Sequence, residues 1–254
     1  MDLELTDRNV VVTGASRGIG RACARTFAAE GARLVLAARG AEELDALAAE
    51  LRDAHGTDVT TVACDLTDSD DRAGLVEAAG DVDVWVNNAG AVPSGTLATL
   101  DEESFRAGWE LKLFGYVDLM RRVLPAMEER RAGVVVNVIG AAGVRPDPGY
   151  IAGAGSNAAL MNMTRALGSR SLRNGVRVVA VNPGLIRTER LETLMRSTAE
   201  RRGIDPGQWE TLLPSDPAPG TPREIADVVA FLASSRASYV TGTTLTADGG
   251  SSAR

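Results

Sequence analysis

The stretch that decides the fold is Thr13–Gly20, which reads TGASRGIG and stands between a valine-rich run and an alanine-rich segment. The valine run is typical of a buried strand, and the alanine-rich segment is typical of a helix. Gly14 allows a sharp turn, Gly18 lets the backbone approach a pyrophosphate, and Gly20 permits close packing of helix against strand. The stretch therefore predicts a phosphate site at the start of the helix, where free amides and the helix dipole favour an anion.

The same alternation of short apolar runs and longer helical segments continues along the chain, which is typical of a parallel sheet with crossover helices. We expect strands at residues 9–13, 33–38, 58–63, 82–86, 133–138, 176–181 and 243–246. We expect helices at residues 19–30, 42–54, 102–129, 151–172 and 222–234. Seven strands in this order predict an α/β fold, a doubly wound seven-stranded parallel sheet with helices on both faces.

No linker-like break divides the chain, so we expect residues 1–254 to form a single domain. The stretch 202–221 is irregular and rich in proline, glycine and aspartate. Irregular segments of this length inside a compact domain are typical of lids and mobile insertions. We predict a flap or lid over about residues 188–221.

Composition excludes several classes of protein. A net charge of −7 argues against a nucleic-acid partner, because such proteins present basic surfaces to phosphates. His55 is the only histidine and lies in a turn-like segment, so we expect no metal site. Cys23 and Cys64 are expected to be buried free thiols. Residues 1–4 do not resemble the start of a signal peptide, and no apolar run is long enough to span a bilayer, so we expect a cytoplasmic protein without a membrane partner.

Five motifs, in this order, resemble those of the short-chain dehydrogenase/reductase family, and the resemblance covers nearly the whole chain. They are TGASRGIG at 13–20, CDLTD at 64–68, NNAG at 87–90, VNPGLIRT at 181–188 and YVTGTTLTADGG at 239–250. The resemblance implies a Rossmann-like fold that binds a nicotinamide dinucleotide.

The resemblance also implies which residues bind that cofactor. Residues of the glycine loop would surround the pyrophosphate, those of the second motif the adenine, those of the third the ribose, and those of the fourth the carboxamide. These residues are Gly14, Ser16, Arg17, Gly18, Ile19, Gly20, Asp65, Leu66, Asn88, Ala89, Gly90, Pro183, Gly184, Ile186 and Thr188.

Charge at the end of the second strand favours NADP over NAD. An acidic residue there would bind the 2′-hydroxyl of the adenosine and repel a 2′-phosphate. This chain has Arg39 at that point and Arg17 in the glycine loop. Two guanidinium groups suit a phosphate through charge-assisted hydrogen bonds, although arginines that are merely solvated are the alternative.

The resemblance fails at the positions that carry the family's chemistry, a serine, an asparagine and a Tyr-x-x-x-Lys pair. Aligned without gaps, Gly153 replaces the tyrosine and Asn157 the lysine, while Gly140 replaces the serine and Lys112 the asparagine. Every cofactor motif survives, so we interpret the four changes as remodelling of the site, with neutral drift as the alternative.

Lys112 and Tyr150 are the candidate catalytic residues. Lys112 is the only lysine in the chain and is aligned with a position that faces the nicotinamide in the family, whereas a lysine on a long helix is most often solvated. Its primary amine can titrate, donate a proton or form a Schiff base, which a guanidinium cannot do. Tyr150 lies at the expected start of a helix, where it either faces the mouth of the pocket or packs against the flap.

Three functions follow from these residues. The first is an NADP-dependent oxidoreductase acting on a carbonyl or hydroxyl group of a small molecule, with Lys112 replacing the tyrosine as proton donor. The second is a non-redox enzyme that uses Lys112 as base or amine nucleophile. The third is a catalytically silent nucleotide-binding or partner protein. The resemblance also implies a homodimer or homotetramer.

Overall fold

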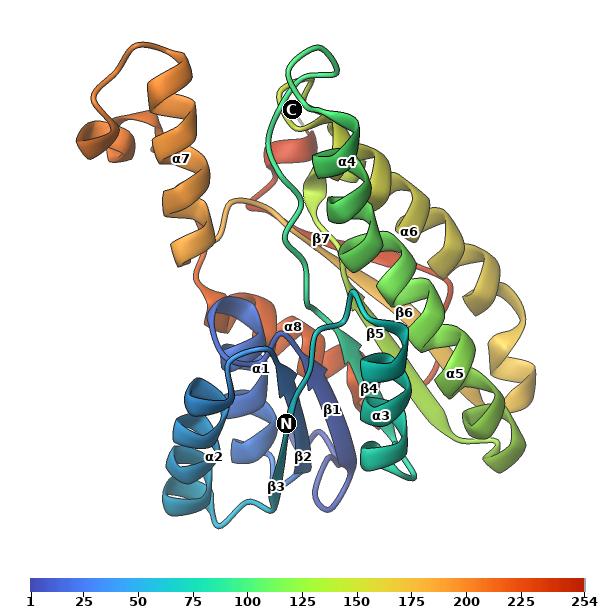
Figure 1. Ribbon diagram of the computed structural model, residues 1–254. Helices are drawn as coiled ribbons and strands as arrows, with labels where there is room; N and C mark the ends of the chain where they lie inside the picture. The colour runs from blue at the N-terminus through green and yellow to red at the C-terminus, as the bar shows by residue number, and fades with distance from the viewer. Residues whose placement is uncertain (254) are drawn as a thin grey trace.

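The computed structural model describes residues 1–253, which form one α/β domain around a seven-stranded, fully parallel sheet (Figure 1). The strand order is β3-β2-β1-β4-β5-β6-β7. The strands are β1 (Asn9–Thr13), β2 (Arg33–Ala38), β3 (Val59–Ala63), β4 (Val84–Asn87), β5 (Gly133–Val138), β6 (Val176–Pro183) and β7 (Thr244–Ala247). The order reverses direction between β1 and β4, which is where open α/β sheets form their ligand crevice. The predicted doubly wound fold is confirmed.

Helices cover both faces of the sheet, with one apolar cluster on one face and two on the other. Helices α1, α2 and α8 pack on one face, and α3, α5 and α6 pack on the other. The helices are α1 (Gly18–Ala29), α2 (Ala41–His55), α3 (Ser69–Ala79), α4 (Glu102–Trp109), α5 (Gly115–Arg130), α6 (Ile151–Ser171), α7 (Glu189–Arg201) and α8 (Pro222–Ala233). A π-helical turn at Glu110–Phe114 joins α4 to α5, so the single long helix expected there is interrupted.

Two helices were not predicted, α3 and α7. Helix α3 begins with an N-cap, since the Asp68 carboxylate accepts hydrogen bonds from the backbone amides of Asp70 and Asp71. Helix α7 occupies the first part of the segment predicted as a flap, and a short 3₁₀ turn at Pro206–Leu212 follows it. In Figure 1 these two elements, in orange, stand apart from the helices on the sheet.

Several strand ends differ from the prediction by one or two residues, and the changes in β4 and β6 are the largest. Strand β4 begins at Val84 and not at residue 82, because the Asp83 carboxylate accepts a hydrogen bond from the backbone amide of Asn9. Strand β6 continues to Pro183, which is paired with Ala247 of β7. Both changes leave the carboxyl ends of the central strands at one edge of the sheet.

The two cysteines are buried and free, as predicted. Burial raises the pKa of the Cys23 thiol to about 12 and that of Cys64 to about 11, so both stay protonated at neutral pH. None of the helices within residues 1–253 combines the length and the apolar composition that crossing a membrane requires.

Candidate functional site

The turn between β1 and α1 forms a cradle of backbone atoms. Gly14 has a φ of +66°, a left-handed conformation that favours glycine. A Cβ atom at Gly20 would lie 2.2 Å from the carbonyl oxygen of Gly14, so only glycine fits there. Arg17 is the N-cap of α1 but makes no capping hydrogen bond through its side chain, and the first turn holds no acidic residue. The first amides of α1 are therefore open to an anion, and the cradle fits a pyrophosphate.

Thr13 ties this cradle to the end of β4. Its buried hydroxyl accepts hydrogen bonds from the backbone amides of Asn88, at 2.9 Å, and Ala89, at 3.1 Å. The Asn88 side chain donates in return to the carbonyl oxygen of Thr13, at 2.9 Å. The NNAG segment thus lies beside the glycine loop at the point where the strand order reverses.

Two arginines lie beyond the carboxyl ends of β1 and β2. Arg39 follows β2 and Arg17 caps α1, and both are exposed. Arg39 also helps to lower the pKa of Asp65, although the main cause there is a hydrogen bond from the backbone amide of Thr67. Arg17 pairs with Glu189 at 3.5 Å, and the two side chains are 71% and 76% exposed, so water screens this contact. Both guanidinium groups remain available to a phosphate.

The segment after β6 crosses over the glycine loop. Ile186 is bridged to Gly220, and the Thr188 side chain caps the first turn of α7. A Cβ atom at Gly18 would lie 3.3 Å from the Thr188 methyl group, which places the start of α7 against the cradle. The remaining residues predicted to contact a cofactor lie on the cradle or at the carboxyl ends of the strands. They are Ser16, Ile19, Leu66, Gly90, Pro183 and Gly184.

Lys112 is buried at the end of β5, with 7% of the residue exposed. Its Nζ donates to the carbonyl oxygen of Val138 at 2.7 Å and to the Tyr116 hydroxyl at 3.1 Å, and that hydroxyl donates to the same carbonyl. The side chain lies against Gly90, where a Cβ atom would come within 2.8 Å of its Cδ. Burial, followed by the positive charge of Arg190, lowers the pKa of Lys112 to about 7. Lys112 is thus not a solvated lysine.

The chemistry of this amine follows from its surroundings. An ammonium group has three N–H donors, and the hydrogen bonds of Lys112 use two of them. Its Nζ also lies 4.7 Å from the centroid of the Tyr116 ring. A pKa of about 7 also allows the amine to gain or lose a proton near neutral pH. The residue sits in the π-helical turn between α4 and α5, an irregularity frequently found at functional sites.

Tyr150 fills the space beside Gly153. A Cβ atom at Gly153 would lie 2.0 Å from Cε1 and Cζ of the Tyr150 ring. The Tyr150 hydroxyl accepts a hydrogen bond from Nη2 of Arg190 at 3.2 Å, and the same nitrogen donates to the carbonyl oxygen of Val92 at 2.7 Å. Tyr150 therefore lies against the segment predicted as a flap. Within residues 1–253 no acceptor is recorded for its hydroxyl proton, so that proton is free to meet a ligand.

Gly140 and Asn157 fit each other in a similar way. Gly140 has a φ of +144° and donates its backbone amide to the Asn182 side chain at 3.3 Å. The Asn157 amide nitrogen donates to the carbonyl oxygen of Gly140 at 3.3 Å. A Cβ atom at Gly140 would lie 2.8 Å from that nitrogen, so Asn157 occupies the space that a side chain at position 140 would need.

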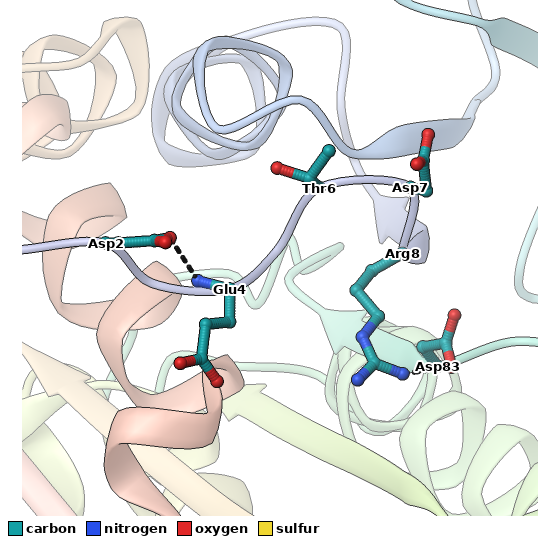
Figure 2. A pocket seen from close by; sticks show the side chains of 6 residues that line it. All are labelled: Asp2, Glu4, Thr6, Asp7, Arg8 and Asp83. Atoms are coloured by element: carbon teal, nitrogen blue, oxygen red, sulfur yellow. Dashed lines mark hydrogen bonds and ion pairs between the residues drawn. The ribbon is translucent and has the colours of Figure 1, made fainter.

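A surface hollow of about 450 Å³ lies at the opposite end of the domain (Figure 2). Its lining residues are Asp2, Glu4, Thr6, Asp7, Arg8 and Asp83. Arg8 pairs with Asp83 at 3.2 Å beside the start of β1. The hollow is distant from the glycine loop, because it lies at the amino end of the strand whose carboxyl end carries that loop.

Sequence reasoning missed Tyr116 and Arg190. Tyr116 follows Lys112 by four residues, and helical spacing would have brought their side chains together. Arg190 in the first turn of α7 meets Tyr150 although the two residues are 40 positions apart, and no local pattern in the sequence indicates that contact.

Comparison with known proteins places the whole domain among reductases. A family model described as enoyl-(acyl carrier protein) reductase matches residues 14–252. The 3-oxoacyl-[acyl-carrier-protein] reductase of Thermotoga maritima is 34% identical over 255 residues, covering 98% of this chain and 99% of that one. The L-sorbose reductase of Gluconobacter frateurii, solved with NADPH and L-sorbose, is 31% identical, with a TM-score of 0.89 and 98% of each chain covered. The 3-ketoacyl-(acyl-carrier-protein) reductase of Brucella melitensis, solved with NADH, is 29% identical, with a TM-score of 0.86 and 98% and 100% covered.

Proposed function

The chain belongs to the short-chain dehydrogenase/reductase family, and we propose that it is an NADP(H)-binding oxidoreductase that interconverts a carbonyl and a hydroxyl group without the family's usual tetrad. The observation that carries this proposal is the buried Lys112 amine, which lies at the carboxyl edge of the sheet, beside the cradle and the NNAG segment.

The backbone cradle would hold the pyrophosphate, and Arg17 and Arg39 would bind the 2′-phosphate. Glu189 pairs with Arg17 at 3.5 Å, but both side chains are exposed and water screens this contact. Arg39 is exposed as well and makes only a weak electrostatic contribution to Asp65. The complex of the Gluconobacter frateurii reductase with NADPH supports this choice, whereas the Brucella melitensis complex contains NADH. When bound, the nicotinamide would supply or accept a hydride.

We assign the proton and the polarisation of the substrate oxygen to Lys112 and Tyr150. Gly153, Asn157 and Gly140 stand where the family has tyrosine, lysine and serine, and none of the three offers a proton donor of comparable strength. The hydrogen bonds of Lys112 use two of its three N–H donors, and the hydroxyl proton of Tyr150 has no recorded acceptor within residues 1–253. Two donors aimed at one oxygen would stabilise negative charge that develops there as the carbonyl is reduced.

Cofactor binding and turnover test this proposal separately. Titration of the protein with NADPH and NADH, followed by cofactor fluorescence, should give saturable binding that is stronger for NADPH. Oxidation of NADPH at 340 nm with a panel of ketones and aldehydes should then identify a substrate, and Lys112→Met and Tyr150→Phe should lower kcat while NADPH binding persists. Absence of binding to either nucleotide would overturn the proposal, and so would unchanged kcat in both variants.

A second candidate function uses the Lys112 amine as a nucleophile. The observation in its favour is the pKa of about 7, which leaves much of the amine neutral at physiological pH. A neutral amine can form a Schiff base with a carbonyl compound without any redox step. Borohydride reduction in the presence of pyruvate should then attach a group to Lys112, the only lysine, and mass spectrometry would locate it.

We also propose that the protein assembles with copies of itself and that residues 188–221 act as a flap. Exposed apolar side chains on the π-helical turn and on α6 support assembly, namely Phe114, Met163 and Leu167. Light scattering of the wild type and of Phe114→Glu tests it, because a charge inside an apolar interface should yield monomers.

A further inference from the structure

Arg190 has more hydrogen-bond donors than its contacts within the protein use. A guanidinium group has five N–H donors, and both recorded bonds of Arg190, to Val92 and to Tyr150, come from Nη2. These bonds hold the side chain across the gap between α7 and the loop after β4. The N–H groups on Nε and Nη1 therefore remain available to an anion.

No carboxylate within residues 1–253 pairs with Arg190 or with Lys112. The two acidic residues closest to Arg190 on its own helix are engaged elsewhere. Glu189 pairs with Arg17 at 3.5 Å, and Glu192 pairs with Arg196 at 2.8 Å. Arg190 and Lys112 also lie within each other's electric field, since the charge of Arg190 contributes to the lowered pKa of the lysine. Arg190 and Lys112 thus form a positively charged region in a protein whose net charge is −7.

We propose that Arg190, with the support of Lys112, binds a carboxylate of the substrate, and that this carboxylate lies next to the reacting carbonyl. This inference rests on the proposed function. The carboxylate and the carbonyl of the substrate must be close together, because Nη2 of Arg190 is 3.2 Å from the Tyr150 hydroxyl. An anion bound to the guanidinium would therefore lie close to a carbonyl oxygen bound by Tyr150. The substrates that fit are 2-oxo acids and the corresponding 2-hydroxy acids.

This inference can be tested with an acid and its ester, which carry the same reacting carbonyl group. Benzoylformate and methyl benzoylformate share the same 2-oxo group, and only the first carries a charge. Calorimetric titration of the protein saturated with NADP⁺ should show the acid binding about tenfold more tightly than the ester, because a charge-assisted hydrogen bond is lost in the ester. Arg190→Gln should remove this difference.

Arg201→Gln is the matched control, because Arg201 lies at the last turn of the same helix and its recorded bonds go to hydroxyl groups within α7. It removes the same charge from the flap and should keep the preference for the acid. Equal affinity of acid and ester in the wild type would overturn the inference, as would binding of neither probe or an equal loss in both variants.

The phosphates of the cofactor are the other anions that Arg190 could bind in place of a substrate carboxylate. NADPH fluorescence titration of Arg190→Gln distinguishes the two sources, because a substrate site predicts unchanged NADPH affinity. A loss of NADPH affinity of about tenfold with the acid preference intact would assign Arg190 to the cofactor and overturn the inference. If the wild type fails to bind NADPH, the proposed function is overturned as well. If the protein binds NADPH but binds the acid and the ester with equal affinity, only this inference is overturned.

Discussion

The ring of Tyr150 lies where a side chain at Gly153 would begin, with Cε1 and Cζ 2.0 Å from the position of a Cβ atom. The sequence motifs predict that position 153 corresponds to the catalytic tyrosine of the family, and the ring that lies next to this point comes from three residues earlier in the chain. The Tyr150 ring and a side chain at position 153 therefore cannot occupy the same space.

A methyl group at Gly153 should displace Tyr150. Gly153→Ala is expected to lower the free energy of unfolding by about 1–3 kcal/mol, because the ring must leave its site and its bond to Arg190. Urea denaturation measures this loss. Gly74→Ala is the control: Gly74 also lies within a helix, α3, but has nothing within 4 Å of a Cβ atom, so alanine should stabilise the protein slightly. Similar effects of the two substitutions would contradict the packing described for Tyr150.

The lowered pKa of Lys112 predicts a pH dependence of stability. The unfolded chain binds a proton at this residue up to about pH 10.5, whereas the folded chain releases it near pH 7. Between these values the unfolded state holds more protons, so the free energy of unfolding rises with pH. The wild type should gain about 2 kcal/mol relative to Lys112→Met between pH 7 and pH 9, measured by urea denaturation. A difference between the two proteins that does not change with pH would show that the Lys112 pKa is not lowered.

Reversal of charge at Arg39 should weaken NADPH and spare NADH. Arg39→Asp is expected to raise the dissociation constant of NADPH by about tenfold or more, because a carboxylate would face the 2′-phosphate. Cofactor fluorescence measures both constants. Arg33→Asp, at the other end of β2, is the control and should leave both unchanged. An equal loss for NADPH and NADH in Arg39→Asp would mean that Arg39 does not read the 2′-phosphate.

The sheet could be predicted because its signal is local and repeated. Each buried strand is a short valine-rich run, and the glycine spacing after β1 marks the turn into α1. Helix α3 lacked a clear apolar stripe, so periodicity did not indicate it. Helix α7 is rich in charged residues, with only Leu191 and Ala199 buried, and it lies in the segment predicted as a flap. The Asp68 cap and the acidic first turn were the available signal for α3.

The candidate site could be predicted only in part. Alignment with the family predicts that Lys112 faces the site; the structure shows that it is buried and not solvated, while its contact with a ligand stays a prediction. The Tyr116 hydroxyl, the fit of Asn157 to Gly140 and the bond from Arg190 to Tyr150 depend on how separate segments meet. Positions 150 and 190 are brought together by the placement of α7, which no pattern along the chain specifies.

A crystal structure of the protein with NADP⁺ tests the central claim most directly. In that structure Lys112 Nζ and the Tyr150 hydroxyl should both face the C4 side of the nicotinamide, where one substrate oxygen could lie about 3 Å from each. The 2′-phosphate should contact Arg17 and Arg39. A nicotinamide bound elsewhere, or one whose C4 faces neither Lys112 nor Tyr150, would contradict the account.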